Sequence, residues 1–138
     1  MDKRIRWLRR SYWLGAVFDG LTLIPMLWPR AGGAMFGIED FQPDIEYRYA
    51  MGLGASLMAG WTFLLLWADR KPVERKGVLL LTVFPVLFGL ILSGAWALPR
   101  SELVQTRKAV PMFVFQAAIT TLFMYSYLQA RGLEEESS

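Results

Sequence analysis

The chain has no cysteine and no histidine among its 138 residues. The absence of cysteine excludes a disulfide, a zinc–thiolate site, an iron–sulfur cluster and a cysteine nucleophile. The absence of histidine removes the commonest metal ligand and the usual general base near neutral pH. We therefore expect no metal site and no cofactor, and the composition leans away from an enzyme without excluding one.

Charged residues are also scarce, and they are unevenly distributed. Only 20% of the residues are charged, whereas 54% are hydrophobic. The mean hydropathy of +0.32 is unusual for a soluble domain. Of the 15 basic and 12 acidic residues, only Asp19 lies inside one of four apolar runs. A soluble bundle would place charges along one face of every helix, so this segregation favours a membrane protein. The runs cover residues 11–28, 50–67, 77–98 and 109–128.

The apolar runs predict the fold class and the domain organisation. A helix needs about 20 apolar residues to cross the hydrocarbon core, so each run is long enough to span it. The loops at 68–76 and 99–108 are short, which favours antiparallel neighbours. We predict an all-α membrane protein with a single domain over residues 1–130, folded as an antiparallel four-transmembrane-helix bundle. The residues at 131–138 are expected to form an acidic disordered tail.

Basic residues are distributed asymmetrically over the two sides of the predicted bundle. The N-terminal segment, the loop at 68–76 and the tail carry ten of them, and the loops on the opposite side carry five. The positive-inside rule therefore places both termini in the cytoplasm. The net charge of +3 is explained by side chains that face anionic lipid headgroups. Membrane lipids are thus the expected partners, and nucleic acid is not.

Asp19 lies near the centre of the first run. Insertion scales assign a carboxylate at that depth a free-energy penalty of about 3 kcal/mol, so it cannot face lipid. No lysine or arginine lies inside a run to pair with it. We expect a protonated carboxyl that donates a hydrogen bond to another helix. The possible partners are Ser56, Thr62, Thr82, Ser93, Gln116, Thr120 and Thr121.

Three interpretations of Asp19 are open at this point. It is a neutral polar clamp between helices, the floor of a pocket for the polar end of a ligand, or a proton-titrating site. The pocket interpretation joins Asp19 to polar side chains on its own face and on the other helices. This predicted ligand-binding set comprises Asp19, Tyr12, Thr22, Ser56, Thr82, Gln116 and Thr120.

Small residues recur at helical spacing on two of the predicted spans. Gly52, Ser56 and Gly60 share one face of the second span, and Gly89 and Ser93 share one face of the third. Such faces let another helix approach closely. The approaching helix can belong to the same chain, to a second copy or to a membrane partner protein, and the sequence leaves these alternatives open.

The chain begins with a basic segment, and its first span contains an aspartate. Two further stretches of sequence, at 49–60 and 75–85, follow these features. Together they resemble small bacterial four-transmembrane-helix proteins grouped around DoxX and its uncharacterised relatives. The resemblance covers the whole chain at the level of topology and involves no catalytic motif. It implies a multi-pass protein of the prokaryotic inner membrane, often of unassigned function, and it assigns no functional residue.

The preferred functional hypothesis is a bundle that binds a lipid or an apolar small molecule around Asp19. One alternative is a structural or assembly subunit, or a homo-oligomer, that packs through the small-residue face of the second span. A further alternative is a proton-coupled carrier or a membrane enzyme, which would require a carboxyl that titrates during activity. The composition supports a membrane location for all three.

Overall fold

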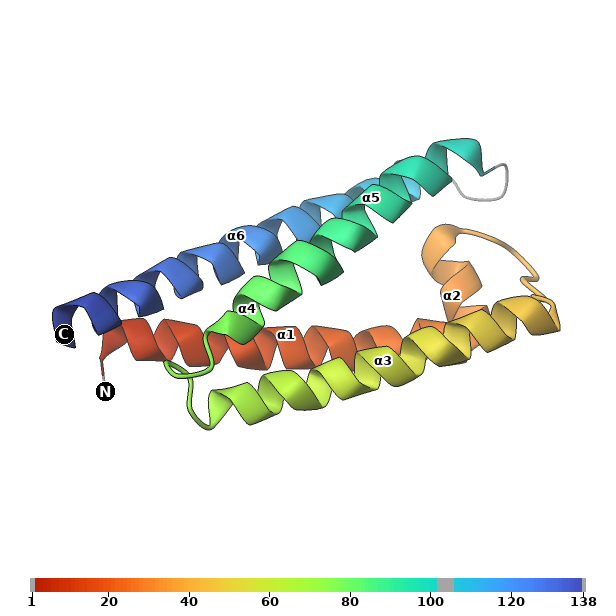
Figure 1. Cartoon of the computed structure of the whole chain (residues 1–138). Helices are drawn as coiled ribbons and strands as arrows, with labels where there is room; N and C mark the ends of the chain where they lie inside the picture. The colour runs from red at the N-terminus through yellow and green to blue at the C-terminus, as the bar shows by residue number, and fades with distance from the viewer. Residues whose placement is uncertain (1, 102–105, 138) are drawn as a thin grey trace.

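The computed structural model describes residues 2–101 and 106–137, and these residues form helices and short connections without a strand (Figure 1). The predicted all-α fold is thereby confirmed, and each apolar run falls almost entirely within helical backbone. The elements are α1 (Lys3–Leu27), α2 (Pro29–Phe36), α3 (Ile45–Asp69), α4 (Gly77–Leu81), the π-helix η1 (Thr82–Leu87), α5 (Phe88–Ala97), the 3₁₀ turn η2 (Leu98–Arg100) and α6 (Thr106–Ser137).

Local sequence signals explain where several of these helices begin and end. The side chain of Asp2 accepts a hydrogen bond from the backbone N–H of Arg4, which caps α1. Asp44 caps α3 by accepting from the N–H of Tyr47 at 2.8 Å. The short helix α2 begins with a proline and ends at Gly37, which has a φ of 73°. Only glycine adopts that left-handed conformation without steric strain.

Pro85 lies inside η1, which joins α4 to α5 without a break in the helical backbone. Because proline has no backbone N–H, it interrupts the α-helical hydrogen-bond ladder, and the chain takes the wider π-helical pattern around it. Thr82 begins this segment and is buried. Its Oγ1 accepts a hydrogen bond of 3.0 Å from Nε1 of Trp61 in α3. The π-helix is therefore anchored to α3 at its first residue.

Three helical segments are long and apolar enough to cross a membrane, namely Ile45–Asp69, Gly77–Arg100 and Ala109–Gly132. They match three of the four predicted spans. The helix α1 has 25 residues but does not belong to this group, because Asp19 and several hydroxyl and aromatic side chains lower the hydropathy of its run. The structure thus supports a multi-pass membrane protein with three spanning helices and a long fourth helix packed beside them.

The helices are packed closely at one end and diverge toward the other (Figure 1). Both termini lie at the packed end, where α1, α3, α4 and α6 surround a common core. Toward the opposite end, α5 and α6 move away from α1 and α3, and α2 lies between them. We call these two parts the packed half and the open half. The core residues of the packed half are Leu8, Tyr12, Ala16, Leu65, Ala68, Val78, Leu79, Val83, Phe123 and Ala130.

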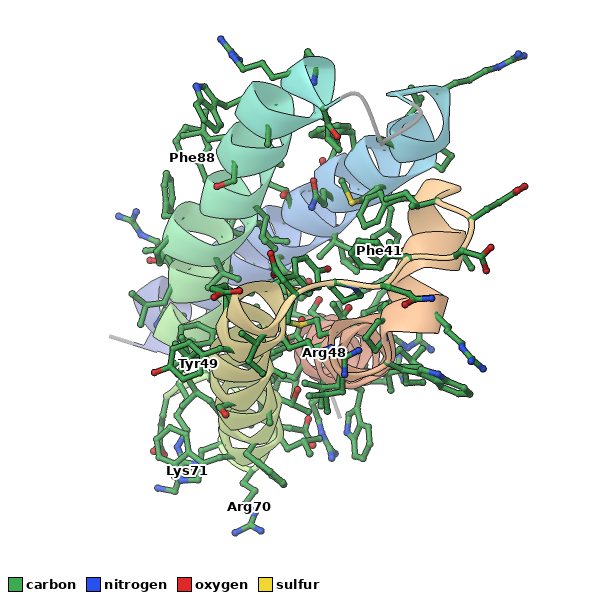
Figure 2. The ribbon with its side chains drawn as sticks, turned by 90° about the vertical axis from the view of Figure 1, so that its right-hand side faces the viewer. Phe41, Arg48, Tyr49, Arg70, Lys71 and Phe88 are labelled. Carbon is green, nitrogen blue, oxygen red and sulfur yellow. The ribbon has the colours of Figure 1, made fainter. Side chains whose placement is uncertain are left out.

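Fewer residues are buried in the open half than in the packed half, although Leu98 and Ala109 are buried there. Ala16 is the last buried residue of α1, although that helix continues to Leu27. In α3, Ala55 is the only buried residue before Leu65, and α5 has none. The exposed side chains of the open half are mainly large and apolar, as lipid contact requires. Phe88, for example, points away from the other helices (Figure 2).

Polar contacts reinforce the packed half at two places. The guanidinium of Arg9 forms two hydrogen bonds of 2.9 Å with the carboxylate of Asp69, linking α1 to α3. Nε1 of Trp13 donates a third hydrogen bond of 3.2 Å to the same carboxylate. On the other side of α1, the buried hydroxyl oxygens of Ser11 and Ser126 are 2.7 Å apart, which links α1 to α6. These contacts join the ends of three long helices.

The helix α6 includes most of the acidic segment at 131–138. Its backbone is helical to Ser137, and the disordered tail stays a prediction. Leucine, arginine and glutamate are strong helix formers. Extending an existing helix also requires no new nucleation, which is the costly step in helix formation. Residue 138 lies outside the described part of the chain.

Candidate functional site

Asp19 lies on α1 one turn beyond Ala16, where the packed half ends and the open half begins. Its side chain is half-buried, and its Oδ2 atom is shielded from solvent without a hydrogen-bond partner among the described residues. A buried polar atom without a partner is rare in folded proteins, because the desolvation of that atom is not compensated. The described residues therefore leave the Oδ2 atom of Asp19 without the hydrogen bond that its burial requires.

Gln116 on α6 is the second residue of this kind. It is only 8% exposed, and its Oε1 also has no partner within the described chain. The rings of Phe18 and Phe115, the preceding residues on the two helices, meet edge to face with centroids 4.4 Å apart. This ring contact brings the segments that carry Asp19 and Gln116 together across the interface between α1 and α6. Asp19 and Gln116 thus lie on segments of α1 and α6 that contact each other.

The hydroxyl groups predicted to contact Asp19 form hydrogen bonds within their own helices instead. Each donates to the backbone carbonyl four residues earlier, an arrangement that serine and threonine commonly adopt inside helices. The distances lie between 2.7 and 3.1 Å. Asp19 has no hydrogen bond to any of them, so the structure gives no support to a clamp between helices. The residues concerned are Thr22, Ser56, Thr62, Thr82, Thr120 and Thr121.

Two members of the predicted ligand-binding set belong to the packed half. Tyr12 is fully buried, and its hydroxyl donates a hydrogen bond of 3.1 Å to the carbonyl of Pro72 in the loop between α3 and α4. Thr82 accepts the hydrogen bond from Trp61. Sequence spacing alone could not reveal these tertiary partners. Both residues thus stabilise helix packing, and the site is reduced to Asp19 and Gln116, with the backbone-bonded Thr120 one turn away from the latter.

No other described helix covers the small-residue face of α3. A methyl group added at Gly52 or Gly60 would meet no described atom within 4 Å, and the same holds for Gly89 on α5. The face of α3 that packs on α1 is a different one, because it carries Gly54, against Met26, and the buried Ala55. Ser56 and Ser93 are likewise exposed, so the predicted face is open to a partner as far as the described residues show.

The chemistry available at Asp19 and Gln116 is hydrogen bonding to a donor group. A carboxylate and an amide oxygen both accept hydrogen bonds, so an ammonium group can donate to both atoms, whereas a hydroxyl, which has a single O–H, can donate to one of them. Phe18 and Phe115, which are both partly exposed, provide an apolar surface beside them. Sequence reasoning identified Asp19 and Gln116 but missed this aromatic pair, since phenylalanine is common throughout the apolar runs.

Comparison of the chain with protein-family models, with curated proteins and with solved structures gives no match. The resemblance to DoxX-like proteins therefore stays a prediction, and the function is argued from the geometry of the site.

Proposed function

We propose that the chain is an integral membrane protein that binds a lipid or another apolar small molecule whose polar end carries a hydroxyl or an ammonium group. The observation that supports this function is that the buried oxygens of Asp19 and Gln116 have no hydrogen-bond partner among the described residues and lie on contacting segments of α1 and α6. Their desolvation is unfavourable in the free protein and would be offset by a donor group of the ligand. The open half provides an apolar surface beside them for a hydrocarbon chain.

The proposed membrane arrangement includes α1 as a fourth span, with both termini in the cytoplasm of a prokaryotic cell. The excess of basic residues near the termini and in the loop between α3 and α4 supports this orientation. The pairing of α1 with α3 and α6 also supports it, because a helix packed between two spans lies at the same depth. In this arrangement Asp19 lies within the bilayer and Arg9 lies at its cytoplasmic surface.

Ligand binding can be tested with three probes that share one hydrocarbon chain. Oleyl alcohol and oleylamine carry donor groups, whereas methyl oleate carries none. We expect the first two to raise the melting temperature of the purified chain and methyl oleate to have little effect. Replacing Asp19 by leucine and replacing Gln116 by leucine should each weaken binding of oleylamine about tenfold, since each variant removes one hydrogen bond from the ammonium group to a buried polar group. Oleyl alcohol has a single O–H, so one of the two variants should weaken its binding by a similar factor.

Thr22→Val provides the matched control for this experiment. Thr22 lies one turn from Asp19 on the same helix, is exposed, and bonds only to the backbone of Phe18. Its variant should bind the alcohol and the amine as the unmodified chain does. Equal stabilisation by methyl oleate, or unchanged binding of oleylamine in Asp19→Leu, would contradict the proposed site.

A second candidate function is homo-oligomer formation through the small-residue face of α3. The specific observation is that Gly52 and Gly60 are open to the outside of the bundle. Because the chain has no cysteine, Ser56→Cys introduces a single thiol on this face. We expect this variant to form a disulfide-linked dimer in oxidised membranes, and adding Gly52→Leu and Gly60→Leu should abolish the dimer. A thiol at Phe88 on α5 serves as the control, and equal cross-linking there would indicate random collision.

A further inference from the structure

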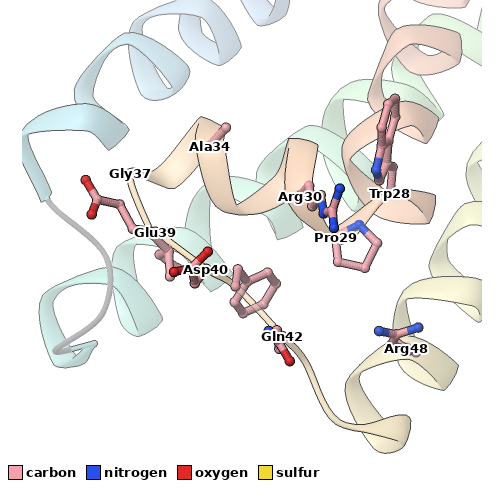
Figure 3. A pocket seen from close by; sticks show the side chains of 11 residues that line it. Trp28, Pro29, Arg30, Ala34, Gly37, Glu39, Asp40, Gln42 and Arg48 are labelled. Atoms are coloured by element: carbon pink, nitrogen blue, oxygen red, sulfur yellow. The ribbon is translucent and has the colours of Figure 1, made fainter.

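A polar pocket lies at the end of the molecule away from both termini (Figure 3). It has a volume of about 730 Å³ and is formed by the end of α1, by α2, by the loop after it and by the start of α3. It is separate from the Asp19 region, since neither Asp19 nor Gln116 contributes to its wall. The lining residues that matter for its chemistry are Trp28, Arg30, Glu39, Asp40, Gln42 and Arg48.

The charged side chains of this pocket are segregated by sign. Arg30 and Arg48 lie on the side of Trp28 and Pro29, whereas Glu39 and Asp40 lie toward Gly37 (Figure 3). No ion pair joins the two groups within the described part of the chain. Arg48 uses its Nε to donate a hydrogen bond of 3.3 Å to the carbonyl of Pro43, which leaves its terminal nitrogens available. The pocket thus offers a cationic side and an anionic side.

The loop that carries the acidic residues is held in place by its own packing. The ring of Phe41 meets the ring of Tyr47 edge to face at 5.2 Å. Phe41 also packs so closely on α2 that a methyl group added at Gly33 would lie 2.6 Å from its Cβ. Asp40 has a φ of 52°, a left-handed conformation in which aspartate is tolerated at a small cost. A pocket fixed in this way requires little ordering when it binds a ligand.

The surroundings of the pocket are apolar and exposed. Leu27, Trp28, Ile45 and Tyr49 border it or lie one turn away, and each is at least 60% exposed. Tryptophan and tyrosine at the end of a spanning helix are typical of the membrane–water interface. A ligand in the pocket would therefore have its polar part among the charged residues and any hydrocarbon part against these side chains.

We infer that this pocket binds the headgroup of an aminophospholipid, with its phosphate at Arg30 and Arg48 and its ammonium group at Glu39 and Asp40. Guanidinium groups donate paired hydrogen bonds to phosphate, and carboxylates accept from an ammonium group. An anionic headgroup would satisfy the arginines but would be repelled by the carboxylates. A trimethylammonium group has no N–H to donate. Only a headgroup with both a phosphate and a primary ammonium group matches both sides of the pocket.

The inference can be tested by native mass spectrometry of the full chain with three phospholipids that have identical acyl chains. The headgroups are phosphoethanolamine, phosphocholine and phosphoglycerol. We expect the ethanolamine lipid to bind about tenfold more tightly than the choline lipid, because hydrogen bonds to charged groups are lost with the latter. Arg30→Gln and Arg48→Gln should each weaken its binding by a similar factor. Glu39→Gln combined with Asp40→Asn should remove the preference over choline and strengthen binding of the glycerol lipid.

Two controls separate this site from general electrostatics and from the proposed ligand site in the bundle. Arg107→Gln removes an exposed arginine near the same end of the molecule and should leave the lipid preference unchanged. The losses caused by Arg30→Gln and Arg48→Gln should persist when Asp19→Leu is added, because Asp19 does not line the pocket, so each proposal can fail while the other stands. Unchanged ethanolamine-lipid binding in Arg30→Gln and Arg48→Gln would overturn the inference. Binding of soluble glycerophosphoethanolamine as tight as that of the ethanolamine lipid would also overturn it, because the ligand would then not need to be a lipid. A preference of the unmodified chain for the glycerol lipid would also overturn it.

Discussion

Replacing Phe123 by alanine should lower the free energy of unfolding by about 3 kcal/mol, the usual magnitude for removing a fully buried aromatic ring. The side chain is 1% exposed and belongs to the core of the packed half. It contacts α1 so closely that a methyl group added at Gly15 would lie 2.8 Å from its Cζ and 3.0 Å from Cδ1 of Leu65. The ring therefore fills the space where α1, α3 and α6 meet. Lipid cannot enter the cavity that its removal would create, so the lost contacts would not be replaced.

The matched control is Phe88→Ala on α5. Phe88 is 56% exposed and points away from the other helices (Figure 2), so lipid or detergent can replace the contacts that it loses. We expect Phe88→Ala to lower the free energy of unfolding by less than about 1 kcal/mol, as is usual for substitutions at the surface. Reversible unfolding in mixed micelles measures both values. Equal losses in the two variants would contradict the conclusion that the packed half carries the stability of the bundle.

The helical fold could be predicted because the signal for it is local. An unbroken apolar run leaves the backbone no partner except its own helix, and this holds whatever the neighbouring helices do. Three of the four predicted spans match helices that are long and apolar enough to cross a membrane, whereas α1, which contains Asp19, lies outside that group. The helix α6 extends to Ser137, into a charged segment whose sequence is equally compatible with a disordered tail.

The site was only partly predictable because hydroxyl groups have several possible partners. Spacing placed Tyr12 and Thr82 beside Asp19, but their hydrogen bonds to Pro72 and Trp61 depend on tertiary packing that no local pattern encodes. Gln116 was predicted as a partner of Asp19, and the structure shows it buried without a hydrogen bond to its Oε1 among the described residues. The polar pocket was not predicted, because acidic loop residues such as Glu39 and Asp40 are usually solvated.

The contacts that stabilise the bundle and the residue proposed to bind the ligand lie in different parts of it. The buried core, the Arg9–Asp69 contact and the Ser11–Ser126 contact all lie in the packed half. Asp19 lies beyond this core, where its desolvation is not offset within the described chain. Binding sites often retain polar groups that are unfavourable for folding, and natural proteins compensate for them elsewhere. Asp19 is therefore the residue at which substitution should increase stability.

Insertion scales assign a difference of about 3 to 4 kcal/mol between aspartate and leucine at the centre of a membrane helix. Because Asp19 is only half-buried, we expect Asp19→Leu to raise the free energy of unfolding by a smaller amount, about 2 to 3 kcal/mol. The substitution removes a buried oxygen without a partner and breaks no hydrogen bond within the described residues. Leucine is also a better helix former than aspartate. Reversible unfolding in mixed micelles, without added lipid, measures the effect.

Asp69→Leu is the matched control, because we expect it to lower the free energy of unfolding, whereas Asp19→Leu should raise it. Asp69 accepts hydrogen bonds from Arg9 and Trp13, so Asp69→Leu removes three contacts between α1 and α3. Because Arg9 is largely exposed, we expect a loss of only about 1 kcal/mol. A higher free energy of unfolding in Asp19→Leu and a lower one in Asp69→Leu would distinguish an unsatisfied binding group from a structural one. If Asp19→Leu instead destabilised the chain, Asp19 would have to be a clamp between helices, and the proposed ligand site would lose its basis.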